Sequence, residues 1–306
     1  MNGFGREIER IYRQFEQFSK VLDVELADLI RVSNLAASQF AKVHSDLAKI
    51  ADALAPIQSQ VAGVARSVSE SFQFRIDAGA LHEMLKQGLP PNWAEAESVR
   101  AAGDVVEMMQ ETGWCLVWCP RGAVIDELLD ASDLDERTQI LLDSLERVVD
   151  DLRSCLATIK ESELADLKAV ALRAIDAFID GHSEAAQALS SSCISALIND
   201  VLESSFGRIH SEFLPDPMDQ PWTEFRRWTV LHMVALSLKR YRAEKGDPVP
   251  GVYSRHASAH SISPQQYTRT NSLASLLLLV AFLKELSLVL DEIRNSSASP
   301  GNGTGG

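Results

Sequence analysis

The sequence contains none of the short motifs that mark the commonest nucleotide-dependent and hydrolytic enzymes. P-loop, glycine-rich dinucleotide turn, nucleophile elbow and HExxH zinc motif are all absent. Each of these motifs supplies something that its chemistry requires, namely a cradle for phosphates, an exposed nucleophile or a set of metal ligands. Their absence excludes these familiar enzyme classes, and we expect neither a cofactor nor a metal.

Cysteine is scarce, and its spacing indicates neither a zinc site nor a disulfide framework. The four cysteines are Cys115, Cys119, Cys155 and Cys193. No nearby His or second Cys pair completes a metal site around Cys115 and Cys119. Reduced thiols are the usual state in the cytosol, so the sequence favours a cytoplasmic protein.

A long uninterrupted apolar run and a leader-like N-terminus are also missing. The longest apolar run, Leu276 to Leu283, is about half of what a membrane span requires. The residues from Met1 to Glu9 are polar and charged. We therefore expect a soluble protein without a membrane partner.

The chain carries a net charge of −14, which argues against a surface that coats nucleic acid in general. The charge is uneven along the sequence. Residues 208–294 hold 11 Lys and Arg against 9 Asp and Glu, so this segment is the least acidic part of the chain. Such a distribution is compatible with a local anion site.

Two groups of acidic residues could in principle take part in chemistry. The larger one consists of Asp126, Glu127, Asp130, Asp133, Asp135 and Glu136. Metal binding is conceivable there, but clustered carboxylates of this kind usually form a solvated face. Asp200 and Glu203 lie on a predicted helix, where they could orient a histidine, although a surface role is the simpler interpretation.

The N-terminal region, residues 1–75, carries a seven-residue apolar repeat. One stripe consists of Ile8, Phe15, Leu22, Leu29, Ala36, Val43, Ile50, Ile57 and Val64. Pro56 would kink or interrupt the second half of a helix here. An apolar seam on a polar helix has to be covered by another helix, so the repeat predicts oligomerisation or bundling within the chain.

Apolar residues recur at helical spacing along most of the remaining chain, which predicts an all-α protein. A helical connector, residues 76–132, contains an apolar segment from Gly113 to Pro120 that could be a short extended piece or a buried connector. A helical bundle, residues 133–294, follows, and its last helix is predicted from Pro264 to about Arg294. Residues 295–306 are rich in Ser, Gly and Asn and are expected to be disordered.

One cationic and titratable cluster precedes the last predicted helix. Arg255, His256 and His260 lie within six residues, in a chain with seven histidines. Ser263-Pro264-Gln265-Gln266 resembles a capping box that starts the helix, which places the cluster in a loop. Arginine binds phosphate oxygens through a planar fork, and histidine can move a proton near neutral pH. Together they suffice for metal-independent cleavage of RNA, whose 2′-hydroxyl supplies the nucleophile.

The same spacing of arginine and histidine occurs elsewhere, in a different context. Arg227 and His232 are also five positions apart. They belong to a predicted helix with Trp222 and Trp228, where burial of the rings is favoured over stacking on bases. Arg255, by contrast, is followed directly by a polar histidine.

The segment Tyr253-Ser254-Arg255-His256-Ala257-Ser258-Ala259-His260 resembles the motif of the HEPN superfamily of α-helical ribonucleases and related proteins. That motif consists of an Arg, a polar residue and then a His, near the start of the last helix of a small bundle. Ser254 and Ser261 stand where the similar "N-R-H-x-x-x-H-G" variant has Asn and Gly. The likeness extends over the bundle as a pattern of helices.

The resemblance implies a metal-independent endoribonuclease of the kind that acts as a toxin or in antiphage defence. In catalytic members two protomers bring their motifs together into a composite cleft, so a homodimer that acts on RNA is expected. Arg255 would bind the scissile phosphate, and His260 would act as general acid and base. His256 would assist or position, and a regulatory protein partner would fit such a role.

A non-catalytic interpretation remains open beside this one. Some members of the superfamily have lost catalysis and serve as binding domains, and an Arg/His cluster can also bond to loop carbonyls. The chain would then be a helical interaction or scaffold protein. The two interpretations differ in whether Arg255 and His260 face an open cleft or are saturated by backbone groups.

Overall fold

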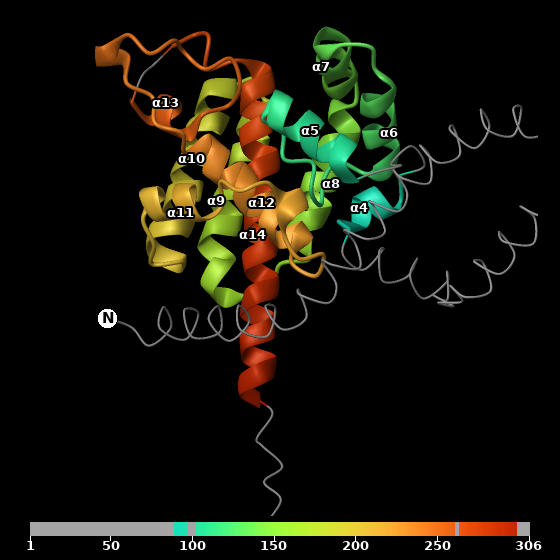
Figure 1. Cartoon of the computed structure of the whole chain (residues 1–306), viewed down its shortest axis with the longest axis vertical. Coiled ribbons are helices and arrows are strands. Elements are labelled where there is room, and N and C mark those ends of the chain that lie inside the picture. The colour runs from blue at the N-terminus through green and yellow to red at the C-terminus, as the bar shows by residue number, and fades with distance from the viewer. Residues whose placement is uncertain (1–88, 97–101, 261–262, 299–306) are drawn as a thin grey trace, which may run out of the picture. The chain divides into compact units, whose positions relative to one another are not determined.

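The computed structural model describes residues 89–96, 102–260 and 263–298, and within these ranges the protein is all-α, as predicted (Figure 1). No strand occurs in the described part. The heptad-patterned region, residues 1–75, lies outside the described residues.

Loops of different lengths and short helical turns connect the helices of the described part. In chain order the α-helices are α4 (Pro91–Ala94), α5 (Ala102–Thr112), α6 (Gly122–Asp130), α7 (Leu134–Asp143), α8 (Leu145–Ala157), α9 (Ala165–Ile179), α10 (Ser183–Ala196), α11 (Phe206–Glu212), α12 (Phe225–Ser237), α13 (Arg255–His260) and α14 (Arg269–Ala298). Short 3₁₀ turns are η2 (Ser162–Leu164), η4 (Pro217–Asp219) and η5 (Ala243–Lys245), and η3 (Leu197–Val201) is a π-helical turn.

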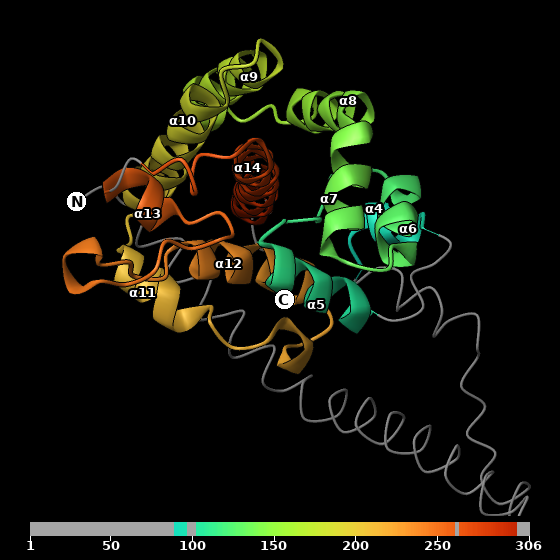
Figure 2. The ribbon, with the colours of Figure 1, turned by 90° about the horizontal axis from the view of Figure 1, so that it is seen from above.

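The central helix of this bundle is α14. Every residue from Asn271 to Leu283 is buried. The helices α8, α9, α10 and α12 pack against α14, and Figure 2, which looks along its axis, shows it surrounded by other helices. A helix that is apolar on all sides is stable in water only when neighbours cover it.

By length and composition, α14 could also cross a membrane. The most apolar window of Arg269–Asn295 has a mean hydropathy of 2.2, and 89% of that window is buried inside the protein. The uninterrupted run from Leu276 to Leu283 is only the middle of this longer apolar segment. Such burial is what the core helix of a soluble protein shows, so the helix is weak evidence for a membrane span.

The segment from Gly113 to Pro120 is a buried connector rather than an extended strand. The Asn92 side chain donates to the carbonyl oxygen of Leu116 at 2.8 Å and accepts from the N–H of Trp118 at 3.0 Å. The indole N–H of Trp93 donates to the same Leu116 oxygen at 2.8 Å. These side chains satisfy backbone groups that a neighbouring strand would otherwise satisfy.

One apolar core unites the described residues on both sides of the predicted boundary at residue 133. It includes Trp93, Val105 and Trp114 from the connector together with Leu152 and Phe282 from the bundle. The described parts of both regions also belong to one compact unit. The connector is therefore a part of the helical bundle.

The structure corrects both ends of the last helix. It begins at Arg269 instead of Pro264, because residues 263–266 form a turn and Thr268 supplies the cap: the N–H of Asn271 donates to Thr268 Oγ1 at 3.1 Å. The helix continues to Ala298, past Arg294. The remaining residues of the predicted tail, 299–306, lie outside the described part.

Candidate functional site

Arg255, His256 and His260 lie on the short helix α13 and not in the loop that the sequence predicts. The signal that was missed is Ser254, whose Oγ accepts from the N–H of Ala257 at 3.1 Å and so caps α13. Positions five apart on a helix lie about 140° apart around its axis, whereas positions four apart lie about 40° apart. The helix therefore places His256 beside His260 and turns Arg255 toward another side.

Buried polar side chains hold α13 and the loop before it in place. Gln266 is fully buried, and its Oε1 accepts from the N–H of Ser254 at 2.8 Å. Its Nε2 donates to two carbonyl oxygens of the preceding loop at 3.0 and 3.1 Å. Gln187 of α10 donates to Ser258 Oγ on α13 at 2.8 Å. Gln266 is thus the residue that orients the motif, and not the member of a capping box.

Arg255 lies partly buried against α10 and α11. Its Nε and Nη2 donate to Ser195 Oγ at 2.8 and 2.5 Å, and its guanidinium carbon lies 4.2 Å from the ring centroid of Phe206. The π-helical turn η3 separates Ser195 from Phe206 in the chain. Burial lowers the pKa of Arg255 from its ordinary value, because it disfavours the charged form.

Arg255 differs from the other partly buried arginines of the described part because it pairs with no carboxylate there. The pairs made by the others are Arg137 with Glu111, Arg147 with Glu127, Arg226 with Glu285, Arg227 with Glu224 and Glu292, and Arg242 with Asp247. A partly desolvated charge without a counter-charge is unfavourable. An anionic ligand would supply the charge that the described residues do not.

His256 and His260 pack against each other, with ring centroids 4.6 Å apart and planes at 43°. Nδ1 of His256 accepts a long hydrogen bond, 3.4 Å, from the N–H of Tyr241, so Nε2 carries the proton in the neutral ring. Burial, then the charges of His260, Arg255 and Arg240, lower the pKa of His256. His260 is exposed and forms no hydrogen bond with another described residue. The pair therefore combines a neutral donor with a freely accessible imidazole.

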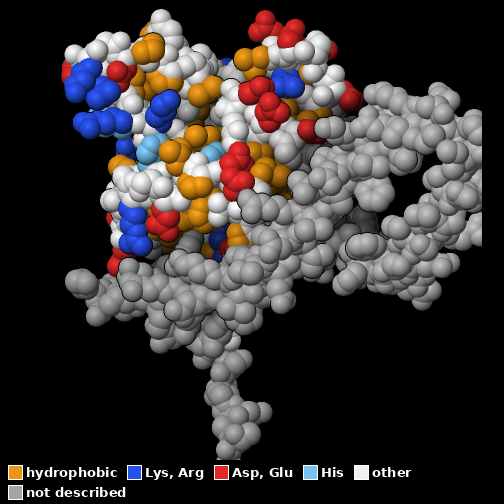
Figure 3. All heavy atoms as spheres, viewed as in Figure 1, with side chains coloured by type: hydrophobic (Ala, Val, Ile, Leu, Met, Phe, Trp, Pro, Cys, Tyr) orange, Lys and Arg blue, Asp and Glu red, His pale blue; other side chains and the backbone are white. Residues whose placement is uncertain are grey.

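The surroundings of the histidine pair are positively charged. Residues 239–269 hold six Lys and Arg against two Asp and Glu, in a chain whose net charge is −14. Figure 3 shows Lys and Arg side chains gathered at the upper left of the view, over α13 and the loop before it, with histidine atoms beside them. This local excess of positive charge would attract an anion to α13.

Carboxylates of the acidic cluster at residues 126–136 cap a helix and form an ion pair. Asp133 caps α7 by accepting from the N–H of Glu136 at 2.9 Å, and Glu127 pairs with Arg147 at 2.7 Å. No group of three or more His, Cys, Asp or Glu in the described part could hold a metal ion. A structural and solvated role accounts for these carboxylates.

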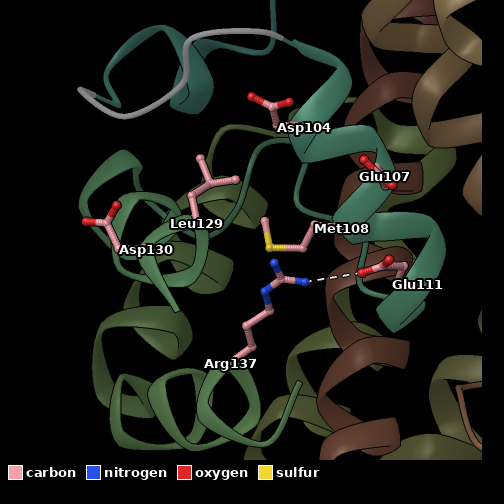
Figure 4. A pocket seen from close by; sticks show the side chains of 7 residues that line it. All are labelled: Asp104, Glu107, Met108, Glu111, Leu129, Asp130 and Arg137. Carbon is pink, nitrogen blue, oxygen red and sulfur yellow. Dashed lines mark hydrogen bonds and ion pairs between the residues drawn. The ribbon is translucent and has the colours of Figure 1, made fainter. Parts of the chain in front are cut away.

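A pocket of about 550 Å³ lies between α5, α6 and α7 (Figure 4). Its lining consists of Asp104, Glu107, Met108, Glu111, Leu129, Asp130 and Arg137. Arg137 points into it and pairs with Glu111 at 3.2 Å, as the dashed line in Figure 4 marks. Four carboxylates against one arginine make this pocket unsuitable for a phosphate, and α13 contributes no residue to it.

The remaining candidates do not join the histidine pair. Asp200 and Glu203 are exposed and form no hydrogen bond with the histidines of α13. Trp222 stacks on a core phenylalanine with ring centroids 4.9 Å apart, and Trp228 packs edge-on against another at the same distance. His232 is buried, with Nδ1 3.0 Å from the Phe213 carbonyl oxygen. The Trp rings are therefore partly buried against the core, and the neighbouring arginines pair with glutamates instead of facing solvent as the sequence predicts.

Comparison with known proteins identifies no relative: no family model, no curated protein and no solved structure matches the chain. The assignment of a function therefore depends on the residues of α13 and on what surrounds them.

Proposed function

We propose that this protein is a HEPN-like, metal-independent endoribonuclease that acts as a toxin or in antiphage defence. The observation that supports it most is Arg255, a partly buried guanidinium without a carboxylate partner in the described part, on the same short helix as two packed histidines. The scissile phosphate of an RNA would provide the anion that Arg255 lacks.

The roles of the two histidines follow from the exposure of His260 and from the hydrogen bond of His256. His260 is exposed, so it can take the proton from a ribose 2′-hydroxyl and deliver a proton to the leaving 5′-oxygen. His256 is neutral near pH 7, because its pKa is lowered, and it presents Nε2–H as a donor to a phosphate oxygen. The bond between the 2′-oxygen and phosphorus forms as the bond to the 5′-oxygen breaks, which leaves a cyclic phosphate.

A homodimer is part of this proposal. Arg255 and His260 do not share a face of α13, since they are about 140° apart around its axis. One copy of the helix is therefore poorly arranged to direct both groups at one phosphate. A second copy facing the first would bring the His260 of one protomer toward the Arg255 of the other, and a composite cleft would result.

A second function is favoured by one specific observation. Arg255 already bonds to Ser195 and lies on Phe206, so it stabilises the place where α10, α11 and α13 meet. In a non-catalytic helical interaction or scaffold protein the same contacts would be purely structural. This alternative predicts no RNA cleavage and a loss of stability when Arg255 is replaced.

RNA cleavage by the purified full chain in EDTA tests the proposal. His260→Ala is expected to lower the cleavage rate at least about 100-fold, because proton transfer by a positioned side chain contributes that much or more. It should leave the unfolding transition and the oligomeric state unchanged, since His260 is exposed.

His182→Ala is the matched control, because His182 is also exposed and lies just before α10, and it should cleave like the unmodified protein. The proposal is wrong if the full chain cuts neither total RNA nor synthetic oligonucleotides, or if His260→Ala cuts as fast as the parent.

A further inference from the structure

Three exposed cations near α13 make no ion pair within the described part of the chain. They are Lys239 and Arg240, which follow α12, and Lys245, the last residue of η5. Arg242 lies between them in sequence but pairs with Asp247 at 3.2 Å. Lys239, Arg240 and Lys245 are together called the basic strip; with Glu244 and Asp247 counted, four cations against two carboxylates leave residues 239–247 with a net charge of +2.

The basic strip lies beside the histidine pair. The N–H of Tyr241, the residue after Arg240, donates to Nδ1 of His256. The charge of Arg240 acts on His256 strongly enough to contribute to its lowered pKa. Tyr241 is 7% exposed, so the backbone that carries the strip is anchored in the protein. Arg240 and His256 thus lie close together, and Figure 3 shows Lys and Arg side chains beside histidine atoms on this face.

We propose that the basic strip binds the backbone phosphates of a single-stranded RNA that passes across α13. The inference rests on the proposed function and adds a docking surface outside the catalytic residues. A chain with a net charge of −14 repels a polyanion elsewhere, so a local positive surface decides where the strand lands. Flexible lysine and arginine side chains suit a flexible strand, whose phosphates can move to meet them.

The expected effect follows from counterion release. Each phosphate contact to a single strand contributes about 0.7 to the slope of log affinity against log salt. At about 0.1 M salt one contact is then worth about fivefold in affinity, so three contacts are worth about 100-fold. Removal of the basic strip should weaken binding by this amount and lower the salt slope by about 2.

The experiment separates binding from cleavage by using the His260→Ala background. Fluorescence anisotropy of a labelled single-stranded RNA oligonucleotide, titrated with the full chain over a range of salt concentrations, measures the affinity. The test variant carries Lys239→Ser, Arg240→Ser and Lys245→Ser. The control removes the same charge from exposed positions on and near α8 and α9, by Arg153→Ser, Lys160→Ser and Arg173→Ser; Arg153 pairs with Asp176 at 2.6 Å, whereas the other two form no ion pair within the described residues.

We expect the test variant to lose affinity and salt dependence while the control keeps both. Equal affinity in the test variant and its parent, no detectable binding by the parent, or an equal loss in the control would overturn the inference. Competition by polyglutamate as strong as that by RNA of equal charge would assign the strip to an acidic protein instead and would also overturn it.

A second measurement distinguishes this inference from the proposed function. With His260 intact, Lys239→Ser and Lys245→Ser together should raise KM for RNA and leave kcat unchanged; Arg240 is kept in this measurement because its charge acts on His256. If the variant cleaves RNA with the KM of its parent, the proposed docking surface is wrong and the proposed nuclease function stands. If the intact chain binds RNA through the strip but does not cleave it, the proposed nuclease function is wrong and the proposed docking surface stands.

Discussion

Helices α12 and α13 carry an arginine and a histidine at the same spacing, with opposite outcomes. On α12, Arg227 pairs with Glu292 at 2.8 Å, and His232 is buried with bonds to a carbonyl oxygen and to Gln110. On α13, Arg255 pairs with no described carboxylate and His260 is exposed. The spacing by itself therefore indicates nothing about function.

The difference comes from the helix against which each one packs. α12 lies against α14, which presents the carboxylates of Glu285 and Glu292 to its arginines. α13 lies against α10, which presents the neutral side chains of Gln187 and Ser195. A neutral neighbour leaves the charge of Arg255 uncompensated, and this makes α13 the better candidate for binding an anion.

The largest expected effect is the loss of stability when the buried carboxylate that pairs with α12 is removed. Glu285 is 2% exposed and accepts from Arg226 at 2.7 Å and from the indole N–H of Trp118 at 2.8 Å. Glu285→Ala leaves both donors without their partner, so the free energy of unfolding should fall by about 3–5 kcal/mol. Glu163→Ala removes the exposed partner of Arg294 and should cost less than about 1 kcal/mol. Urea unfolding measures both variants. Equal losses of stability would contradict the view that the ion pairs of α12 stabilise the protein from the inside.

Replacement of His232 and of His260 by alanine should also distinguish α12 from α13, with a smaller effect on stability. His232→Ala removes a buried ring and leaves the Phe213 carbonyl oxygen and Gln110 without a partner, so it should cost about 2 kcal/mol. His260→Ala should change the free energy of unfolding by less than about 0.5 kcal/mol. Urea unfolding of both variants measures this. A cost at His260 as large as that at His232 would mean that His260 is structural.

The smallest expected effect is a dependence of stability on pH. Burial is the largest cause that lowers the pKa of His232 and of His256, so both bind a proton less readily in the folded chain than in the unfolded one. Above the ordinary histidine pKa of about 6.5 neither state is protonated, and below it the unfolded chain takes up protons first. The free energy of unfolding should therefore decline as the pH falls from 7 to 5. His256→Gln should make this decline shallower. Urea unfolding at several pH values measures it, and an unchanged dependence of the free energy of unfolding on pH would contradict the prediction.

The local parts of the fold could be predicted from the sequence. Periodicity predicts the all-α class, which the described residues confirm, and the cap of α7 by Asp133 is a feature of the same local kind. Pro91 in the first turn of α4 is another such feature, since a proline fits the start of a helix. Each of these signals depends on residues a few positions apart, which is the range over which sequence patterns are informative.

The environment of the candidate site could not be predicted in the same way. The sequence predicts Ser263 as a cap, whereas Ser254 caps α13 and is held by Gln266, whose bonds reach back 12 residues and more. Ser195 meets Arg255 across 60 residues of chain. No local pattern reports such a contact, so the motif could be found from the sequence while its partners could not.

The position of α14 has a consequence for how the chain is made. This helix comes after α8, α9, α10 and α12 in the sequence, although it forms the centre on which they pack. During synthesis those helices leave the ribosome with their inner faces open to water, and such intermediates are prone to aggregation. Folding of the bundle can be completed only once the stretch up to about residue 290 has emerged, so chains released before that point would be targets for chaperones and proteases.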